Sequence, residues 1–294
     1  MNQKYYSNGK LLFTGEYLVL DGANALAFPT KFGQSMSVTK INEPKIIWKS
    51  FNCNDEIWLH CEFLINEIEL PQNKIGDEKD RLISILREVK KLNPKFLNET
   101  NGYCIITKLD FARNWGLGSS STLISNISKW TNVDPFQLLD ATFGGSGYDI
   151  AAAQRNAPIL YAKALNEYHI TELSINWGFT NQIFFVHLNK KQNSRNGIFK
   201  YQKLKNNNQE VIGRINELTK TICHCQSLLE FELVIDEHEQ LISTIIQQKT
   251  VKELLFNDKK FSKDIVKYVL LENIGNPVLV DFNLNDLLNE VTYA

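Results

Sequence analysis

The sequence predicts an α+β protein with two lobes, divided near residue 165. Strand patterns dominate the first part of the chain, and long helical patterns dominate its later part. Early strands followed by a helix-rich region are typical of the α+β class. With 294 residues, the chain has room for one large domain or for two domains of ordinary size. We therefore expect one lobe at 1–165 and a second at 166–294.

Composition and charge narrow the classes of partner. Hydrophobic residues make up 43% of the chain, as expected for a globular protein with a real core, and the formal net charge is −1. A chain without a broad basic field is not expected to bind nucleic acid or a membrane surface. The polar first residues, with no long apolar stretch after them, predict a cytoplasmic protein. A basic run between Asn189 and Lys205 is either a solvated face or a contact for an anionic substrate.

The five cysteines are odd in number and irregularly spaced, which is typical of free thiols in a reducing compartment. Two short segments contain the residue types that bind zinc: Cys223, His224 and Cys225 in one, and His60 and Cys61 in the other. The usual Cys-x₂₋₄-Cys spacing is missing, and neighbouring donors cannot easily face one ion. We therefore do not expect a zinc ion there.

β-Branched and aromatic residues predict strands in the first part of the chain. Residues 7–20 are predicted as a strand, a turn at Thr14 and Gly15, and a second strand, followed by a turn at Asp21 and Gly22. Further strand patterns lie at 25–28, 34–39, 45–51, 56–63 and 102–109. Residues 80–91 are predicted as an amphipathic helix, whose apolar stripe consists of Leu82, Ile83, Ile85, Leu86 and Val89.

The segment NWGLGSSS at 114–121 leads from the strand predicted at 102–109 into a helix. Gly116 and Gly118 permit a tight backbone path, and the serines that follow are typical helix caps. A glycine loop at a helix N-terminus is a site for an anion such as phosphate, although the pattern also fits a glycine turn with an ordinary cap. The Gly-Lys-Ser/Thr and G-x-G-x-x-G patterns are absent, so this is neither a Walker loop nor a dinucleotide fingerprint.

A second glycine segment, GGSGYDIAAA at 144–153, follows a helix predicted from Pro135 with Asp134 as its N-cap. Gly144 is expected to end that helix. Ser146 and Asp149 match a capping box for a further helix at 150–154. The spacing alone favours this structural role for Asp149.

Strand and helix patterns both occur in the remainder of the chain. Strands are predicted at 182–188 and 277–282, and helices at 211–228, 230–248, 251–256 and from residue 285. A polar loop is predicted at 189–196.

Three segments together resemble the GHMP small-molecule kinases, the superfamily of galactokinase, homoserine kinase, mevalonate kinase and phosphomevalonate kinase. SNGKLLFTGEY at 7–17 is similar to the first motif of that family, GLGSSS at 116–121 to its phosphate loop, and GSGYDIA at 145–151 to the segment with the catalytic aspartate. Three motifs in this order are more specific than any one of them. TGEY and GSGYD are most similar to the phosphomevalonate kinase branch, and KQNS at 191–194 adds a weaker similarity.

The resemblance implies a two-lobed fold with mixed sheets and helices packed on one side. It implies that 1–165 binds nucleotide and carries the phosphate loop and the catalytic aspartate, and that 166–294 contributes to acceptor binding. Lys10 and Asp149 would be catalytic: Lys10 would stabilise charge near the γ-phosphate of ATP, and Asp149 would take or orient the acceptor's proton.

The binding residues follow from the same resemblance. The residues implied for ATP are Gly116, Leu117, Gly118, Ser119, Ser120 and Ser121. Those implied for Mg²⁺ are Ser120 and Asp140. Those implied for the acceptor are Glu16, Ser146, Gly147, Lys191, Ser194 and Arg195.

The sequence also departs from the family pattern. Asn8 stands where proline is usual, and RNW at 113–115 replaces the expected lead into the phosphate loop. The family's metal-binding acid corresponds to Leu138, so Asp140 takes that role only if the intervening loop is shorter. The third motif corresponds to LENIGNP at 271–277, which has one glycine where a glycine-rich loop is usual.

The expected function is an ATP-dependent kinase of a small metabolite, with phosphomevalonate as the first candidate acceptor. Mevalonate or homoserine phosphorylation is the alternative within that class. A nucleotide- or metabolite-binding protein without catalysis is favoured by the weak third motif, whereas Lys10, Ser120 and Asp149 favour an active enzyme. A plain α+β protein whose motifs coincide by chance is a third alternative. We expect a monomer or a homodimer.

Overall fold

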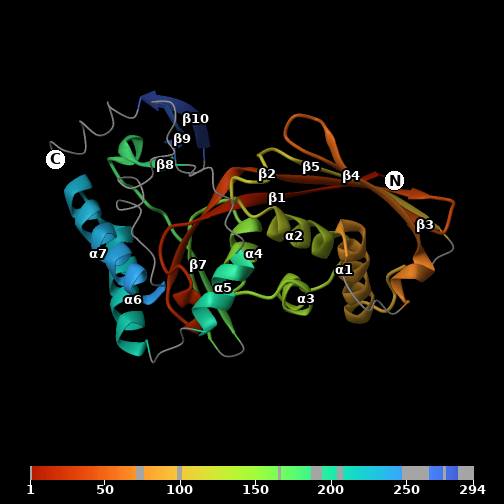
Figure 1. Ribbon diagram of the computed structural model, residues 1–294, viewed down its shortest axis with the longest axis horizontal. Coiled ribbons are helices and arrows are strands. Elements are labelled where there is room, and N and C mark those ends of the chain that lie inside the picture. The colour runs from red at the N-terminus through yellow and green to blue at the C-terminus, as the bar shows by residue number, and fades with distance from the viewer. Residues whose placement is uncertain are drawn as a thin grey trace. The chain divides into compact units, whose positions relative to one another are not determined.

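The computed structural model describes residues 2–70, 76–97, 101–164, 167–186, 194–203, 208–246, 265–273 and 276–283. Its strands and helices form an α+β arrangement (Figure 1). Two compact units are present, and neither is continuous in sequence. The first consists of Met1–Leu11 and Phe32–Asn156, and the second consists of Leu12–Lys31 and Ala157–Ala294.

These units differ from the continuous lobes expected at 1–165 and 166–294. Residues 12–31, close to the start of the chain, belong to the second unit. The reason is the long strand β2 (Ala25–Ile41), whose first residues pair with β6 (Ile159–Lys163) and whose later residues pair with β5 (Gly102–Leu109). Local patterns predict strand at both ends of β2, but they identify neither the continuous strand nor the different partners of its two ends.

The first unit contains a mixed sheet. It is built from β1 (Asn2–Leu12), the later part of β2, β3 (Lys45–Phe51), β4 (Ile57–Leu64) and β5. The strand order is β4-β3-β5-β2, with β1 beside β2; β3 and β5 are parallel, whereas β4 pairs with β3 and β2 pairs with β5 in antiparallel fashion. The strands predicted at 45–51 and 102–109 are confirmed residue for residue. Those predicted at 25–28 and 34–39 are parts of the single strand β2.

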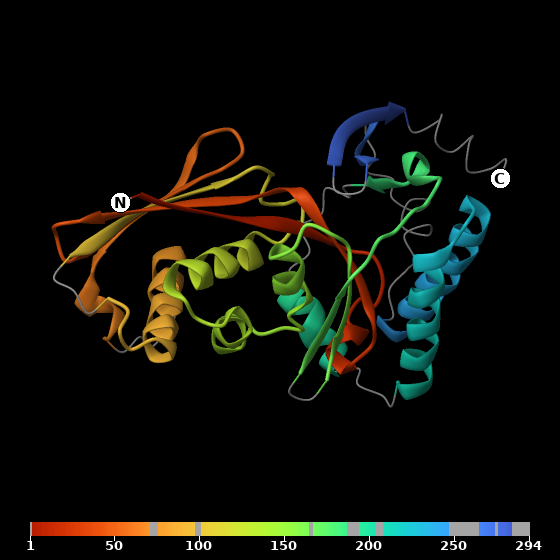
Figure 2. The same cartoon turned by 180° about the vertical axis from the view of Figure 1, so that it is seen from behind.

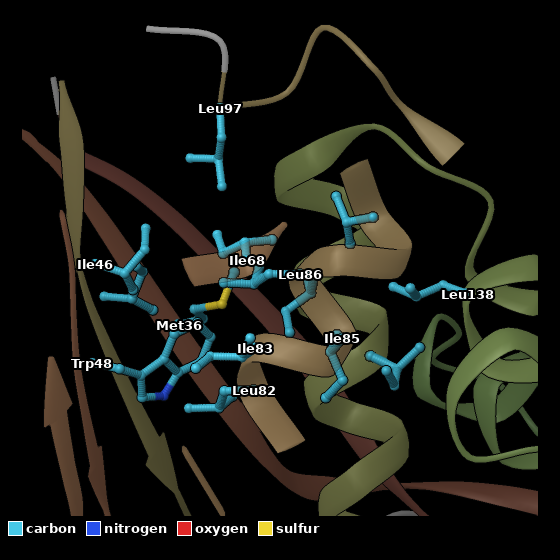
Figure 3. Packing of buried hydrophobic residues seen from close by; sticks show 14 of the residues in the cluster. Met36, Ile46, Trp48, Ile68, Leu82, Ile83, Ile85, Leu86, Leu97 and Leu138 are labelled. Atoms are coloured by element: carbon cyan, nitrogen blue, oxygen red, sulfur yellow. The ribbon is translucent and has the colours of Figure 1, made fainter. Parts of the chain in front are cut away.

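Helices cover one face of this sheet, as Figure 1 and Figure 2 show from opposite sides. They are α1 (Glu78–Leu92), α2 (Ser119–Thr131) and α3 (Pro135–Thr142), and the short α4 (Tyr148–Ala153) packs on α2 and α3. The predicted stripe of α1 is confirmed, because Leu82, Ile83, Ile85, Leu86 and Val89 are all buried. They meet Met36, Ile46 and Trp48 in the main core (Figure 3). Each such side chain contributes about 1.5–3 kcal/mol when fully buried.

The N-terminal caps of α1 and α3 follow local chemistry. The Asp77 side chain accepts the N–H of Asp80 at 2.9 Å. The Asp134 side chain accepts the N–H groups of Phe136 and Gln137, and Pro135 occupies the first turn, as predicted. Both helices therefore begin where an acidic side chain satisfies N–H groups that lack helical partners.

The second unit contains the first part of β2, β6 and β7 (Tyr168–Glu172), paired in the order β2-β6-β7. A separate sheet has the order β10-β9-β8 and is formed by β8 (Phe184–Val186), β9 (Ile265–Asn273) and β10 (Asn276–Asn283). The helices of this unit are α5 (Ser194–Lys203), α6 (Gln209–His224) and α7 (Leu228–Ile246). Among the described residues, no helix is both long and apolar enough to cross a membrane.

The second strand predicted within residues 7–20 is wrong. Leu18–Asp21 is instead a 3-10 helix, η1. Gly15 has φ 81° and Tyr17 has φ 59°, so backbone with positive φ reverses the chain before a strand can extend. Leu18 and Val19 are then buried inside the second unit rather than alternating along a strand.

Later elements agree with the predictions in part. The strand predicted at 277–282 is confirmed by β10. The helix predicted at 211–228 ends earlier, at His224, because the side chains of Ser227 and Glu230 accept N–H groups at a new helix start. Residues 194–196, predicted as loop, begin α5. The helices predicted at 251–256 and from residue 285 lie outside the described residues.

Candidate active site

Lys10 connects the three sequence motifs within the first unit. Its Nζ donates a 3.1 Å hydrogen bond to the carbonyl of Gly116, and its backbone N–H donates to the carbonyl of Leu117 at 3.0 Å. The same Nζ lies 5.5 Å from the centroid of the Tyr148 ring, within cation–π range. Its charge also acts on Asp149, the next residue of α4. Segments more than a hundred residues apart thus meet at one cation.

The glycine loop enters α2 through left-handed backbone. Gly116 has φ 78° and Gly118 has φ 84°, and Gly118 is the N-cap of α2. No side chain caps this helix; Ser121 lies inside the first turn, where its Oγ donates to the carbonyl of Gly118 at 2.8 Å. The expectation that a serine caps α2 is therefore wrong. The first N–H groups of the helix are left for water or an anion, which is the arrangement of an anion site.

The loop residues alternate in exposure. Gly116 and Ser120 are exposed, whereas Leu117 and Ser121 are buried at 3% and 2%. Leu117 packs into a small core with Leu109. This buried leucine anchors the loop while the neighbouring backbone faces solvent, as a phosphate-binding loop requires.

The two glycines of the loop have different surroundings. A Cβ at Gly116 would meet no heavy atom within 4 Å, whereas one at Gly118 would lie 2.6 Å from Ser121 Oγ and 3.2 Å from Lys10 Cε. The absence of a side chain at Gly118 is thus required for the lysine to lie along the loop. Open space beside Gly116 and a cation beside its carbonyl fit the phosphates of a nucleotide.

Asp149 is the second residue of α4 and not a cap. Gly147, with φ 90°, is the N-cap, and no side-chain cap is formed, so the predicted capping box of Ser146 and Asp149 is wrong. Asp149 Oδ1 instead accepts the N–H of Ile150 at 3.0 Å. Burial raises the pKa of Asp149 above its ordinary value, and the charge of Lys10 partly opposes that rise. A carboxylate with a raised pKa beside a lysine is suited to accept a proton.

The residues predicted for Mg²⁺ lie on two helices. Ser120 is exposed in the first turn of α2, and Asp140 is exposed on α3. Leu138, the position that the family pattern indicates, is fully buried. The described residues contain no group of three or more His, Cys, Asp or Glu side chains placed for a metal. Mg²⁺ keeps several waters and substrate oxygens, so a hydroxyl and one carboxylate fit it, and the pair Ser120–Asp140 stays a prediction.

The residues predicted for the acceptor are divided between the units. Ser146 is 7% exposed and Gly147 caps α4, both beside Asp149 in the first unit. Glu16 is exposed in the second unit, Ser194 and Arg195 begin α5 there, and Lys191 lies outside the described residues. These acceptor contacts stay predictions.

Sequence reasoning missed two residues that contact the site. Tyr148 faces Lys10 with its ring, and Asn8 binds the end of α4 through Arg155 and Asn156. The i, i+2 spacing of Asn8 and Lys10 on a predicted strand was a usable signal, because such residues share one side of the strand.

A buried polar cluster joins α2 to the strands. Ser7 Oγ contacts Ser125 Oγ at 2.8 Å and Asn126 Oδ1 at 2.9 Å, and the Asn126 side chain donates to the carbonyl of Gln34. Lys129 Nζ donates to Ser7 Oγ at 3.0 Å, and burial lowers the pKa of this lysine. The cluster fixes the register between α2, which begins at the glycine loop, and β1, which carries Lys10.

Comparison with known proteins places the chain in a known fold. No family model matches the sequence, and no curated protein matches it. Solved structures do match: mevalonate kinase of Methanococcus jannaschii has 13% identity and a TM-score of 0.64, over 100% of this chain and 95% of that one. Galactokinase of Lactococcus lactis, in complex with galactose, has 12% identity and a TM-score of 0.64, over 98% and 87%.

A third match is phosphomevalonate kinase of Streptococcus pneumoniae in complex with phosphomevalonate and AMPPNP. It has 12% identity and a TM-score of 0.60, over 83% of this chain and 80% of that one. The chain therefore has the GHMP kinase fold, an α+β fold whose main sheet is mixed, as expected. At these identities the likeness establishes the fold, and activity must be argued from the site.

Proposed function

We propose that this protein is an ATP-dependent kinase that transfers the γ-phosphate to an oxygen of a small metabolite. The observation that carries the proposal is the position of Lys10, which contacts the glycine loop through Gly116 and the start of α4 through Tyr148. A cation between an anion-binding loop and a carboxylate with a raised pKa supplies the parts that phosphoryl transfer requires.

The N-terminal turn of α2 would hold the β- and γ-phosphates. Its uncapped N–H groups and the helix dipole favour negative charge, and the exposed backbone at Gly116 permits close approach. Lys10 Nζ would move from the Gly116 carbonyl to the γ-phosphate over a short distance. There it would neutralise charge that develops as the bond to ADP breaks.

Asp149 would accept or orient the proton of the attacking oxygen. As that oxygen forms its bond to the γ-phosphorus, the bond from phosphorus to the bridging oxygen of ADP breaks, and the proton of an attacking hydroxyl, or of an attacking phosphate that is still protonated, would pass to the carboxylate. The raised pKa of Asp149 makes it a stronger base than an ordinary aspartate, and the charge of Lys10 favours its ionised form. Mg²⁺, held by Ser120 and Asp140, would neutralise the phosphate oxygens.

Phosphomevalonate is the first candidate acceptor. Its support is the similarity of TGEY at 14–17 and GSGYD at 145–149 to the phosphomevalonate kinase branch. The phosphate or carboxylate of such an acceptor requires cations, and Lys191 with Arg195 would supply them. Mevalonate and homoserine are the alternatives within the same class.

A panel assay tests the proposal and the acceptor together. ADP release from Mg·ATP is measured with mevalonate, phosphomevalonate, homoserine and galactose, using the parent protein and the Lys10→Met and Asp149→Asn variants. We expect turnover with one acceptor, greatest for phosphomevalonate, and its loss in both variants. Asp55→Asn is the control for general charge effects, because Asp55 pairs with Lys108 at an exposed site.

The assay also distinguishes an active kinase from a protein that binds nucleotide without catalysis. If the parent protein binds ATP by calorimetry but releases no ADP with any acceptor, the catalytic part of the proposal is wrong. If ATP does not bind at all, both the kinase and the nucleotide-binding readings fail.

A further inference from the structure

The relative position of Lys10 and Asp149 depends on contacts between two separate elements. Lys10 is on β1, whereas Asp149 is on α4, which has only six residues. A helix of that length is not stable by itself in water, so its place must be set by its neighbours. Helices α2 and α3 pack on α4, and a contact from β1 adds to them in setting the distance from the lysine to the carboxylate.

Asn8 contacts the chain just after the C-terminal end of α4. Its Nδ2 donates to the backbone carbonyl of Arg155 at 2.6 Å and to Oδ1 of Asn156 at 2.8 Å. The direction of the amide is settled by chemistry, because a backbone carbonyl can only accept and must face the NH₂ group. Both N–H bonds of that group are thereby used.

Asn8 and Lys10 lie on the same side of β1. Ser7 and Gly9 are buried, whereas Asn8 and Lys10 are half-buried, which is the alternation of a strand. Two residues of strand span roughly 7 Å, and six residues of helix span roughly 9 Å. One short stretch of β1 thus reaches both ends of α4, with Lys10 at the Tyr148 end and Asn8 at the Arg155 end.

Gln154 is the C-cap of α4, and Arg155, the next residue, bonds back to the last turn of the helix. Its backbone N–H donates to the carbonyl of Ala152 at 3.1 Å, and its Nη1 donates to the carbonyl of Ala151 at 2.9 Å. The carbonyl of Arg155 itself is the acceptor for Asn8. Asn8 therefore binds the residue after the C-cap, and Arg155 in turn bonds to the last turn of α4, the helix that carries Asp149.

We propose that Asn8 is a positioning residue, which holds α4 against β1 so that Asp149 stays beside Lys10. The expected effect of Asn8 on the reaction rate rests on the proposed kinase function. The expected effect of Asn8 on the pKa of Asp149 does not depend on that function. Lys10, from β1, is the charged group that acts on Asp149, and backbone N–H groups of α4 supply the remaining favourable interaction. Moving the lysine away raises the carboxyl pKa.

The test compares Asn8→Ala with a matched control, Asn93→Ala. Asn93 has the same kind of bond in the same unit, since its Nδ2 donates to the carbonyl of Thr131 at 2.8 Å. We expect both variants to melt at similarly lowered temperatures and to bind Mg·ATP with nearly the parent affinity. Asn8→Ala is expected to lower kcat by roughly ten- to a hundredfold, whereas Asn93→Ala is expected to leave it unchanged. Asn156→Ala, which removes one of the two bonds, should fall between Asn8→Ala and the parent.

The decisive readout is the pKa of Asp149, measured by NMR titration of ¹³C-labelled carboxyl groups. We expect it to rise in Asn8→Ala and to stay unchanged in Asn93→Ala, and the acid limb of the pH–rate profile should move with it. Equal melting shifts with an unchanged Asp149 pKa and unchanged kcat would overturn the proposal, because Asn8 would then be a structural bond only. If Asn8→Ala does not fold, the same comparison is made with Asn156→Ala.

The titration also separates this inference from the proposed function. If the parent protein has no kinase activity but the Asp149 pKa still rises in Asn8→Ala, the kinase proposal fails and the positioning role stands. If activity is present and the pKa does not move, the positioning role fails alone.

Discussion

The backbone N–H of Gly15 donates a 3.0 Å hydrogen bond to Nε2 of His238, so α7 holds the turn of the first sequence motif within the second unit. Helix α6 contributes a second bond, from Thr219 Oγ1 to Thr14 Oγ1 at 2.9 Å. Because Nε2 accepts, the neutral ring carries its proton on Nδ1. That nitrogen is buried without a hydrogen-bond partner, and Oε1 of Glu239 lies 4.0 Å from it. The ring thus holds the turn only while it is neutral.

This arrangement predicts loss of stability on acidification. Burial lowers the pKa of His238 to about 4, against about 6.5 in an unfolded chain. The folded state therefore binds fewer protons, so this stabilisation is complete above pH 6.5 and falls as the pH drops toward 4. The loss is on the order of 3 kcal/mol by linkage. Urea unfolding at several pH values should give a free energy of unfolding that falls across this interval.

Two glutamine variants show whether His238 is responsible. His238→Gln keeps an acceptor for Gly15 but does not titrate, so its stability should depend less on pH between 6.5 and 4. His224 is exposed at the end of α6, and His224→Gln should keep the parent dependence. Parallel curves for all three proteins would assign the acid sensitivity to other groups.

Asp149→Asn is predicted to lower activity without lowering stability. The folded-state pKa of Asp149 lies above its unfolded value, so ionisation costs stability that increases as pH rises through the folded pKa. Asparagine removes that cost, and the variant should melt at or above the parent temperature at pH 7, with a smaller difference near pH 4. Its turnover should fall by roughly 10²–10⁴-fold. A melting temperature well below that of the parent, with near-normal turnover, would restore the capping role.

Gly118→Ala is predicted to weaken ATP binding by about tenfold or more, which corresponds to about 1.4 kcal/mol. The new Cβ would lie 2.6 Å from Ser121 Oγ and 3.2 Å from Lys10 Cε, so both groups must move. Gly22→Ala is the control, because Gly22 also has positive φ, at 95°, but its Cβ would meet only a carbonyl at 3.3 Å. Calorimetry with Mg·ATP measures the affinities. Unchanged affinity in Gly118→Ala would place the nucleotide elsewhere.

The prediction that Asp140, on α3, binds Mg²⁺ is tested by substitution of that residue. If Asp140 and Ser120 share Mg²⁺, Asp140→Asn should raise the Mg²⁺ concentration that gives half-maximal activity. Asp134→Asn is the matched control on the same helix, since asparagine caps a helix about as well as aspartate. An identical Mg²⁺ dependence in the two variants would remove Asp140 from the site.

The predictions that succeeded were those that depend on neighbours along the chain. The stripe of α1, the cap at Asp134 and the strands β3 and β5 agree with the structure because periodicity and capping chemistry act over a few residues. The second strand predicted within 7–20 is wrong because two residues adopt positive φ, and one of them is Tyr17, a residue type that rarely does so.

The same distinction, between local sequence and tertiary structure, applies to the candidate site. The sequence by itself determined that a glycine loop precedes α2 and that a lysine and an aspartate stand in segments resembling kinase motifs, because these are properties of residue type and order. From the sequence, a role for Asp149 as a helix cap was at least as well supported as a catalytic role, since Ser146 and Asp149 have the spacing of a capping box. Only the tertiary structure placed Gly147 at the cap and Lys10 against Gly116 and Tyr148. The physical reason is that the burial that raises the pKa of Asp149 and the lysine charge that opposes this rise come from residues far apart in the chain, and local spacing carries no record of them.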